Sequence, residues 1–310
     1  MDIEFPESIS TYDFFQLFPD NQAAIDFLER VRWPDGVICA HCDSDRTTPL
    51  KAYNRHQCNA CRKQFTVRTG TVFESSRIPL HKWLYAMFLL QTARKGISSI
   101  QLSKEVGISQ PAAWFLLHRL REAMLPDDVK LNGEVEIDET YIGGLQKNKH
   151  WDKKLLIATG TTGKQAILGL RQRDGAIIVW PVHAVQGNNI NDEILLYVEE
   201  GATLCTDEHA AYRELHRWFQ HERVKHSRGE DVRGNASTNQ IESLWAVIKR
   251  GYKGVYHYWS PKHSHRYVNE FAFRLVDGKT SVPAMIRVQR LARRAFETRI
   301  TYKELTEGYA

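Results

Sequence analysis

The spacing of apolar residues predicts helices at both ends of the chain and an α/β segment between them. Residues 11–31 show the three- and four-residue spacing of short helices, and residues 79–125 show it for three more. Polar and apolar residues alternate along 134–139, which predicts a strand with Glu134, Glu136 and Asp138 on one face. Further strands are expected at 155–159, 166–170, 176–182 and 202–206, with helices at 189–199, 208–219, 268–275 and 283–298. Such an order of strands and helices is typical of a mixed α/β domain.

The clearest helical pattern covers residues 237–250, after a polar stretch at 221–236 that is expected to be a loop. Its apolar stripe consists of Ile241, Leu244, Trp245 and Ile248. Glu242 and Lys249 project from nearly the same side of this helix, about 10 Å apart along its axis. Asn239 is a candidate N-cap, with Glu242 as the acid of a capping box. On this stretch alone, a structural and a catalytic role for Glu242 both stay open.

A second local pattern predicts a pair of helices before the α/β segment. Ser98 and Gln101 form a capping-box pattern, Gly107 ends the short helix, and Ser109 begins a longer one. A short helix, a glycine turn and a longer helix are typical of the helix-turn-helix, although an ordinary helical hairpin has the same pattern. Candidates for DNA contact here are Gln110, His118, Arg119 and Arg121.

Four of the five cysteines form two C-x-x-C pairs separated by fifteen residues, Cys39 with Cys42 and Cys58 with Cys61. Four thiolates complete the tetrahedral shell of Zn²⁺ and leave no position open for chemistry, so we expect a structural zinc site. Cys205 stands alone and is expected to be a buried strand residue.

Composition and charge indicate which broad class of protein the chain belongs to. Apolar residues make up 42% of the chain and aromatic residues 11%, which excludes wholesale disorder. No apolar run reaches membrane-spanning length and the N-terminus carries no secretory signal, so we expect a cytoplasmic protein without a membrane partner. Residues 221–266 hold nine Lys and Arg against four acids, whereas the rest of the chain sums to zero. This basic stretch, with its aromatic residues, suits a phosphate backbone, although one charge run alone is equally typical of a solvated surface.

Three acids stand at informative places. Asp138 lies on the first strand of the α/β segment, Asp207 ends a later strand, and Glu242 follows it by thirty-five positions. Each also has a purely structural interpretation: Asp138 as a solvated strand residue, Asp207 as a helix cap and Glu242 as a capping-box acid. Together they match the need of two-metal phosphoryl transfer for hard oxygen ligands that converge from different elements.

The order Asp, Asp, thirty-five residues, Glu, with a basic residue seven later, resembles the DDE transposases and retroviral integrases. More narrowly, the chain is similar to ISXO2-like transposases of bacterial insertion sequences, which carry a zinc ribbon before the catalytic domain. The matching segments cover about residues 10–275, and they are 32–36, the four cysteines, 136–144, 206–208, 238–245 with 249–251, and 260–271. One departure is Ala40, where these ribbons usually have proline.

The resemblance implies an RNase H-like catalytic domain at 131–275. Before it we expect an N-terminal helical segment at 1–36, the zinc ribbon at 37–72 and a helix-turn-helix-like domain at 79–125; a basic C-terminal helix at 276–310 follows. Asp138 and Asp207 would hold Mg²⁺ (or Mn²⁺), Glu242 would complete the site, and Lys249 would hold a phosphate. Some members use Asn as the third catalytic residue, so Asn239 is the alternative to Glu242.

The implied function is a DNA transposase that binds the terminal inverted repeats of an insertion sequence, nicks the DNA and joins the freed 3′ end to target DNA, as a homodimer or larger assembly. Two alternatives are a catalytically silent DNA-binding regulator and an RNase H-like nuclease without strand transfer. The residues expected to contact DNA are Arg119, Lys147, Lys149, Lys153, Lys154, Arg228, Arg233, Arg250, Lys253 and Lys262.

Overall fold

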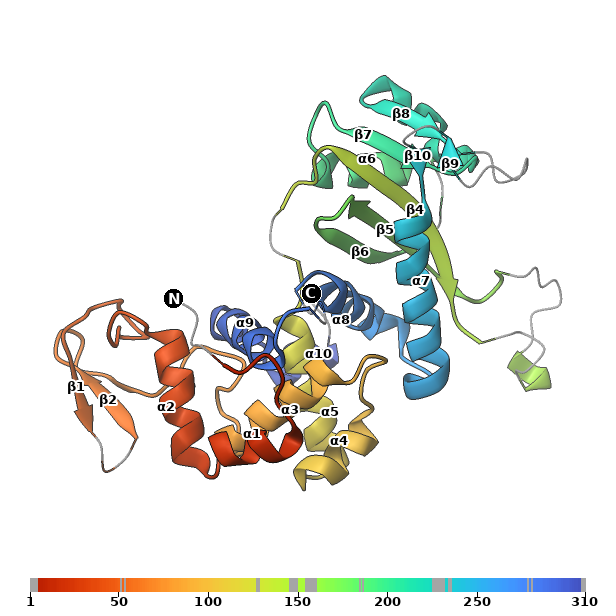
Figure 1. The fold of residues 1–310 in the computed structure, drawn as a ribbon. Helices are drawn as coiled ribbons and strands as arrows, with labels where there is room; N and C mark the ends of the chain where they lie inside the picture. Colours follow the sequence, from red (N-terminus) through yellow and green to blue (C-terminus); the bar gives the residue numbers. More distant parts are fainter. Residues whose placement is uncertain are drawn as a thin grey trace. The chain divides into compact units, whose positions relative to one another are not determined.

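The computed structural model describes residues 5–50, 52, 54–126, 129–144, 150–153, 161–183, 185, 187–224, 232–233, 236–277, 279 and 281–307. The chain forms two compact units. The helical unit joins residues 1–124 with 277–310, and the α/β unit comprises residues 125–276 (Figure 1). The predicted C-terminal segment therefore belongs to the same unit as the N-terminal helices.

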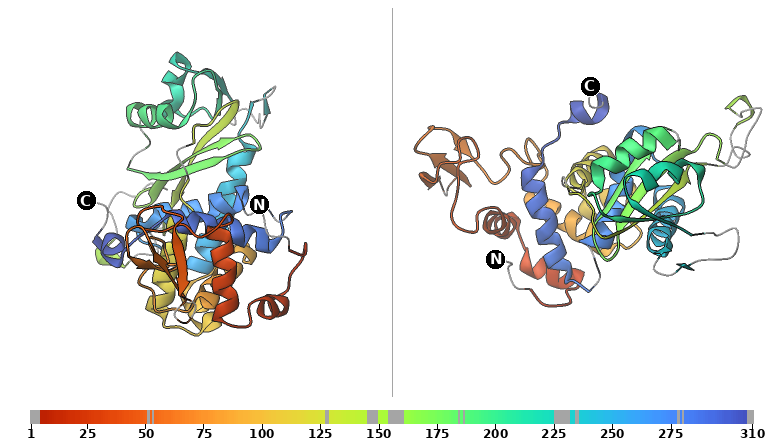
Figure 2. Two further views of the ribbon diagram at one scale, coloured as in Figure 1. Left: turned by 90° about the vertical axis from the view of Figure 1, so that its left-hand side faces the viewer. Right: turned by 90° about the horizontal axis from the view of Figure 1, so that it is seen from above.

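The helical unit is built around α3 (Leu80–Thr92), which is buried along most of its length. It packs against α2 (Asn21–Arg32) and α9 (Ala284–Glu297), so the two ends of the chain share one core (Figure 2). The remaining helices of this unit are α1 (Thr11–Leu17), α4 (Ser99–Val106), α5 (Gln110–Glu122) and α10 (Tyr302–Glu307).

The predicted pair of helices is present as α4 and α5. Ser98 accepts a hydrogen bond from the Gln101 N–H at 3.1 Å, and Gly107 ends α4 in the left-handed conformation at φ 65°. Ser109 begins α5 in the same way. The helical hairpin is therefore confirmed, whereas its role as a DNA-binding helix-turn-helix stays a prediction.

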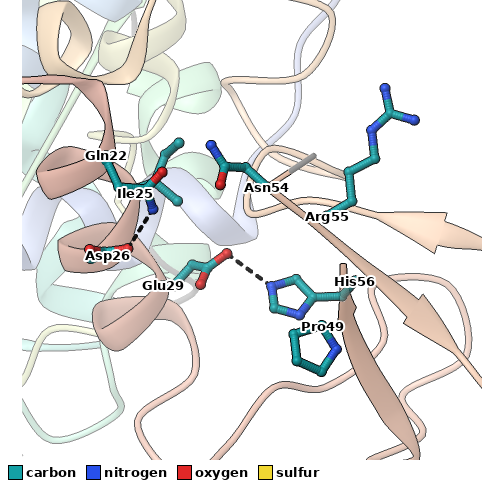
Figure 3. A pocket seen from close by; sticks show the side chains of 8 residues that line it. All are labelled: Gln22, Ile25, Asp26, Glu29, Pro49, Asn54, Arg55 and His56. Carbon is teal, nitrogen blue, oxygen red and sulfur yellow. Dashed lines mark hydrogen bonds and ion pairs between the residues drawn. The ribbon is translucent and has the colours of Figure 1, made fainter. Parts of the chain in front are cut away.

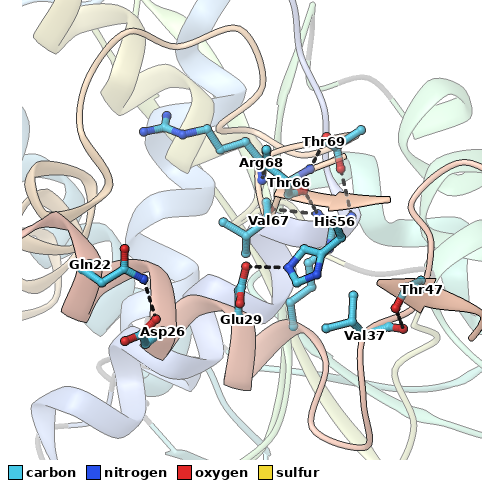
Figure 4. Close-up of polar contacts among 11 residues, drawn as sticks. Gln22, Asp26, Glu29, Val37, Thr47, His56, Thr66, Val67, Arg68 and Thr69 are labelled. Atoms are coloured by element: carbon cyan, nitrogen blue, oxygen red, sulfur yellow. Dashed lines mark hydrogen bonds and ion pairs between the residues drawn. The ribbon is translucent and has the colours of Figure 1, made fainter. Parts of the chain in front are cut away.

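The ribbon consists of β1 (Thr47–Leu50), β2 (Arg55–Cys58) and β3 (Gln64–Phe65), paired antiparallel in that order. It is tied to α2 by an ion pair between Glu29 and the largely buried His56 at 2.9 Å (Figure 4). The Arg32 guanidinium donates to the carbonyls of Val67 and Thr69. A hollow of about 350 Å³ lies between the two elements, with acids on the α2 side and Arg55 on the ribbon side (Figure 3).

The α/β unit contains a five-stranded mixed sheet in the order β6-β5-β4-β7-β8. The strands are β4 (Glu134–Ile142), β5 (Gln165–Gln172), β6 (Ile177–Val182), β7 (Thr203–Thr206) and β8 (Gln220–Arg223). β4, β5 and β6 are antiparallel neighbours, whereas β7 and β8 run parallel to β4. A shorter pair, β9 (Val232–Arg233) and β10 (Ala236–Ser237), lies outside this sheet.

Helices cover both faces of this sheet. The core on one face joins it to α6 (Gly187–Tyr197) and to the 3-10 helix η4 (Ala210–Arg217). The core on the other face joins it to α7 (Asn239–Gly251) and α8 (Ser264–Val276). Between these last two come the π-helix Tyr252–Tyr256 and a 3-10 turn at Pro261–His263. The main sheet thus separates two apolar layers.

Most predicted elements of the α/β unit are confirmed, but the chain departs from the sequence-based expectation at two of them. Strand β8 and the short pair β9–β10 lie where a loop was expected at 221–236. The residues of β8, Gln-His-Glu-Arg, show no apolar alternation, and it pairs only as an edge strand. The helix expected at 208–219 is a shorter 3-10 helix. The strand expected at 155–159 lies outside the described residues.

Among the described residues, none of the helices combines the length and the apolar character that crossing a bilayer would require.

Candidate active site and zinc centre

The register of the mixed sheet places Asp138 beside Asp207. The parallel pair β4 and β7 aligns Glu136 with Cys205 and Ile137 with Thr206. Asp207 directly follows the last residue of β7, so the same register carried one step further would bring it opposite Asp138. The negative charge on Asp207 is the smallest of the contributions that raise the pKa of Asp138, after burial and the charge on Glu139.

The Asp138 carboxyl group is largely buried, and it lies among other acids. Its pKa is raised to about 7, chiefly by burial and also by the charges on Glu139 and Asp207, against hydrogen bonds that lower it. One of those hydrogen bonds comes from the Trp245 Nε1–H, which donates to Asp138 Oδ2 at 2.8 Å. The second oxygen of Asp138 is not used in this contact. A cation at this place would relieve the repulsion between the acids.

Gly169 gives the Trp245 indole the room that this hydrogen bond requires. It pairs with Asp138 across β4 and β5. A Cβ atom at Gly169 would lie 2.5 Å from Trp245 Cη2 and 2.8 Å from Trp245 Cζ2, both closer than real contacts allow. The absence of a side chain at this strand position therefore lets α7 approach the sheet.

The N-terminus of α7 differs from the prediction. Thr238, not Asn239, is the N-cap residue, and Asn239 is the first residue of the helix. Glu242 is therefore the fourth helical residue, so the expected capping box is not formed. The Thr238 hydroxyl donates to Glu242 Oε1 at 3.0 Å instead of capping the helix. The buried Glu136 on β4 accepts from the Ile241 N–H at 2.9 Å.

The orientation of α7 separates the two candidates for the third catalytic residue. On a helix with 100° per residue, Glu242 and Lys249 lie about 60° and 40° to one side of Trp245, and Asn239 lies about 120° away on that side. The opposite side carries Leu244 and Ile248, which share a core with α8 over β6. Since β6 and β7 lie on opposite sides of β4, the flank with Glu242 and Lys249 faces the β7 side of the sheet.

Both Glu242 and Lys249 are exposed on this flank. The three acids do not form a closed ligand set. Among the described residues, no group of three carboxylate, imidazole or thiol ligand atoms within 4.8 Å of one another includes Asp138, Asp207 or Glu242. Asp138 and Asp207 come from adjacent strand ends of the sheet, and Glu242 comes from the neighbouring helix α7.

Glu139 is a further acid at this edge that the sequence analysis did not single out. It follows Asp138 on β4 and therefore faces the other side of the sheet, where it accepts from the Tyr212 hydroxyl at 2.5 Å. His209 Nε2 lies 4.0 Å from its second oxygen. Burial raises the pKa of Glu139, and the charge on Asp207 adds to this effect. Its position directly after Asp138 in the predicted strand was the sequence signal that could have identified Glu139 as a candidate.

The four cysteines of the ribbon come together as predicted. Their sulfur atoms all lie within 4.8 Å of one another. The Cys39–Cys61 and Cys42–Cys58 Sγ–Sγ distances are both 3.7 Å. A tetrahedron with Zn–S bonds of about 2.3 Å has edges of about 3.8 Å, so the sulfur positions fit a Zn²⁺ ion. The His41 and Cys61 N–H groups donate to Cys39 and Cys58 sulfur, which stabilises thiolates.

The structure places the residues expected to contact DNA in different environments. Arg119 is contradicted, because its side chain is only 7% exposed and its guanidinium donates to the carbonyls of Val72 and Glu74 within the helical unit. It also lies over the Phe115 ring. Arg119 therefore stabilises the packing of α5, and a guanidinium held in this way does not reach a phosphate.

The remaining basic candidates belong to the α/β unit. Arg250, Lys253 and Lys262 are exposed at the end of α7 and in the segment after it. Lys153 ends the short 3-10 helix Trp151–Lys153, and Arg233 lies on β9. Lys147, Lys149, Lys154 and Arg228 lie outside the described residues.

Two family models match this chain. Residues 19–64 match a transposase zinc-ribbon domain, and residues 130–275 match an ISXO2-like transposase domain. The chain carries an ISXO2-like transposase domain behind a transposase zinc ribbon. The transposase domain spans the sheet and its helices, so Asp138, Asp207 and Glu242 all lie within it. The resemblance found in the sequence is confirmed.

A relative from a mobile element agrees with this assignment. It is named an uncharacterized protein in transposable element ISH50 of Halobacterium salinarum and is 29% identical over 247 residues. The match covers 75% of this chain and 83% of that protein. It therefore extends well beyond the transposase domain.

Proposed function

We propose that this transposase binds the ends of its insertion sequence and carries out Mg²⁺-dependent cleavage and strand transfer of DNA. The observation that carries the proposal is the parallel register of β4 with β7, in which Asp138 follows Ile137 and Asp207 follows its partner Thr206 within the transposase domain. Two hard oxygen donors with mutual repulsion favour a divalent cation, and Mg²⁺ or Mn²⁺ is the class of ion that carboxylates and water bind. The raised pKa of Asp138 supports the same site.

The side chains then have separate roles. Asp138 and Asp207 hold the cations, and Glu242 completes the ligand set when end DNA is bound. When bound, the cations supply the Lewis acidity that phosphoryl transfer requires. Lys249 lies two turns after Glu242 on the same exposed flank, where an ammonium group suits a phosphate of the cleaved strand. Asn239 lies further round the helix, so Glu242 is the preferred third residue.

The reaction follows from these roles. Water attacks the phosphorus atom at the end of the element, the 3′ oxygen leaves with the electron pair of the broken P–O bond, and it takes up a proton. The freed 3′ hydroxyl then attacks a phosphorus atom of target DNA and loses its proton, and a second 3′ oxygen leaves. Both steps exchange one phosphodiester bond for another bond to phosphorus, so no oxidant or energy-rich donor is required.

Exposed Lys and Arg side chains on and after α7 bind the DNA backbone. Arg250, Lys253 and Lys262 present positive charge on the unit that carries the acids. Lys147, Lys149, Lys153, Lys154, Arg228 and Arg233 are proposed to extend this contact. The zinc ribbon and the α4–α5 hairpin are proposed to read the terminal inverted repeats. Because each transposition event joins two ends, we propose a homodimer or larger assembly as the active form.

The test uses purified protein, labelled end DNA, target DNA and Mg²⁺. Asp138→Asn and Asp207→Asn keep the size of each side chain and remove its charge, and Asp138→Asn also keeps an acceptor for the Trp245 indole. We expect both variants to lose nicking and joining while they still bind end DNA. If either variant nicks and joins at the wild-type rate, the assigned pair is wrong.

The same assay separates the alternatives. A nuclease without strand transfer would give nicked but no joined product. A silent DNA-binding regulator would give neither product while retaining affinity for end DNA. For the third residue, Glu242→Ala is expected to abolish joining and Asn239→Ala to leave it within about twofold; the reverse result would assign the role to Asn239.

A further inference from the structure

At the start of helix α7, the N–H of Asn239 donates to the Ser237 hydroxyl at 3.1 Å, but the N-cap residue Thr238 offers no acceptor to the N–H groups that follow. The N-cap residue Thr238 directs its hydroxyl to Glu242, at 3.0 Å, and makes no capping hydrogen bond. The first N–H groups of a helix have no partner within the helix, and they carry the positive end of the helix dipole. A buried helix start therefore needs an acceptor from elsewhere in the chain.

Glu136 on β4 supplies that acceptor. Its side chain is fully buried, and its Oε2 accepts from the Ile241 N–H at 2.9 Å. The backbone N–H of Gln240 also stabilises the charged carboxylate, although burial raises the pKa of Glu136 overall. A buried carboxylate is costly unless it is paired; here the Ile241 N–H and the helix dipole act on Oε2, and Arg173 Nη2 lies 3.9 Å from Oε1. The acid comes from 105 residues earlier in the chain.

The same strand holds the helix at a second point, through Asp138 and Trp245. Glu136 and Asp138 are two residues apart on one face of β4, a separation of about 6.7 Å. Their partners Ile241 and Trp245 are four residues apart on α7, a separation of about 6 Å. The two spacings match, so the helix runs along the strand with both contacts made at once. A slip by one helical turn would break both and move Glu242 by about 5.4 Å.

We propose that Glu136 is a positioning residue, which sets the reach of Glu242 toward the Asp138–Asp207 pair by fixing the first turn of α7 on β4. Glu242 directly follows Ile241, the residue whose N–H group Glu136 holds. Arg171 on β5 supports the same turn, because its guanidinium donates to the Gln240 carbonyl at 2.6 Å and to the Ser243 hydroxyl at 3.2 Å. This inference rests on the proposed function of Asp138, Asp207 and Glu242.

The experiment compares Glu136→Ala, Glu136→Gln and the control Glu134→Gln. Glu134 lies on the same strand face, two residues earlier; it pairs with Arg173, which also lies 3.9 Å from Glu136 Oε1, so the control removes a charge next to Glu136 without removing the acceptor of the Ile241 N–H. Three properties are measured on the full chain: amide hydrogen exchange in the first turn of α7, calorimetric affinity for Ca²⁺, and the Mg²⁺ dependence of end cleavage.

In Glu136→Ala we expect amide exchange at Gln240 and Ile241 to rise at least about tenfold, since a hydrogen bond to a charged acceptor is lost. Ca²⁺ affinity is expected to fall and half-maximal Mg²⁺ to rise by several-fold. Glu136→Gln keeps one acceptor oxygen, so it is expected to recover part of each loss. Glu134→Gln is expected to match the wild type in all three.

The outcomes separate the inference from the proposed function. Unchanged amide exchange and Ca²⁺ affinity in Glu136→Ala would overturn the positioning role, whatever the activity. A loss of thermal stability in Glu136→Ala with unchanged Ca²⁺ affinity would also overturn it, because the residue would then be structural only. If the wild-type protein does not cleave end DNA, the proposed function fails. The exchange data would still show whether Glu136 fixes the first turn of α7 on β4.

Discussion

The zinc ribbon and the acidic site differ in how their functional atoms come together. The ribbon takes its four sulfur ligands from residues 39–61, and all four lie within 4.8 Å of one another. The acidic site takes its residues from two strands and a helix spread over residues 138–242, and its third acid stands apart from the first two. Short loops and N–H···S contacts build the ribbon locally, whereas sheet register and helix docking build the acidic site. A local site is therefore complete in one segment, and a distributed site depends on the whole unit.

The largest expected effect tests the local site. Cys58→Ser removes a buried ligand from the shell, and structural zinc sites contribute roughly 10 kcal/mol or more to the folding of small domains. We expect loss of bound zinc, measured by atomic emission, and loss of ordered ribbon signals in NMR spectra. The α/β unit is expected to keep its own signals, because it forms a separate compact unit. Retention of one zinc per chain in Cys58→Ser would contradict the four-sulfur shell.

The second-largest expected effect comes from removing one of the acids of the acidic site. Asp207→Asn removes one charge of the coupled pair and with it several kcal/mol of transition-state stabilisation, about a thousandfold in the rate of end cleavage. Zinc content is expected to stay unchanged, since the ribbon lies in the other unit. Single-turnover cleavage rates measure this prediction. A matched Asp174→Asn variant on the exposed β5–β6 turn is expected to keep the wild-type rate.

A smaller effect tests how helix docking supports the acids. Gly169→Ala places a Cβ atom 2.5 Å from the Trp245 ring, and overpacking of this kind costs about 1–3 kcal/mol of unfolding free energy. The measurement is urea unfolding of Gly169→Ala, Trp245→Phe and the double variant. Because phenylalanine lacks the ring atoms that clash, the cost of Gly169→Ala is expected to shrink in the Trp245→Phe background. Additive costs would show that the indole does not lie against this glycine.

The smallest effect concerns the surface. Lys253→Ala removes one exposed cation after α7, so affinity for end DNA is expected to fall by roughly 1 kcal/mol and the salt dependence of log K to lose about one unit of slope. Binding isotherms at several salt concentrations measure both. Lys303→Ala, at an exposed lysine of α10 in the other unit, serves as the control with an unchanged slope. An unchanged slope in Lys253→Ala would remove this residue from the DNA contact.

Local patterns were reliable where neighbouring residues decide the structure. Asp20 was expected to cap a helix and accepts from the Ala23 N–H, and Gly107 ends α4 as expected. The prediction failed at β8, whose polar residues become a strand only because β7 offers a parallel edge. It failed at Arg119 because helical spacing does not tell which charged side chain turns inward to meet carbonyls from a distant segment.

The sequence by itself determined most of the order of elements, the four-cysteine cluster and the resemblance to ISXO2-like transposases, because each rests on residue type and local motifs; the acids of the candidate active site stay a prediction. Only the tertiary structure decided which acids meet. The parallel register of β4 with β7 aligns Ile137 with Thr206, the residues directly before Asp138 and Asp207. Docking of α7 turns Glu242 to the β7 side and recruits Glu136 as the acceptor for its first turn. Hydrogen bonds and charge interactions act over a few ångströms. In this unit the interacting side chains come that close only after segments about 100 positions apart have packed together.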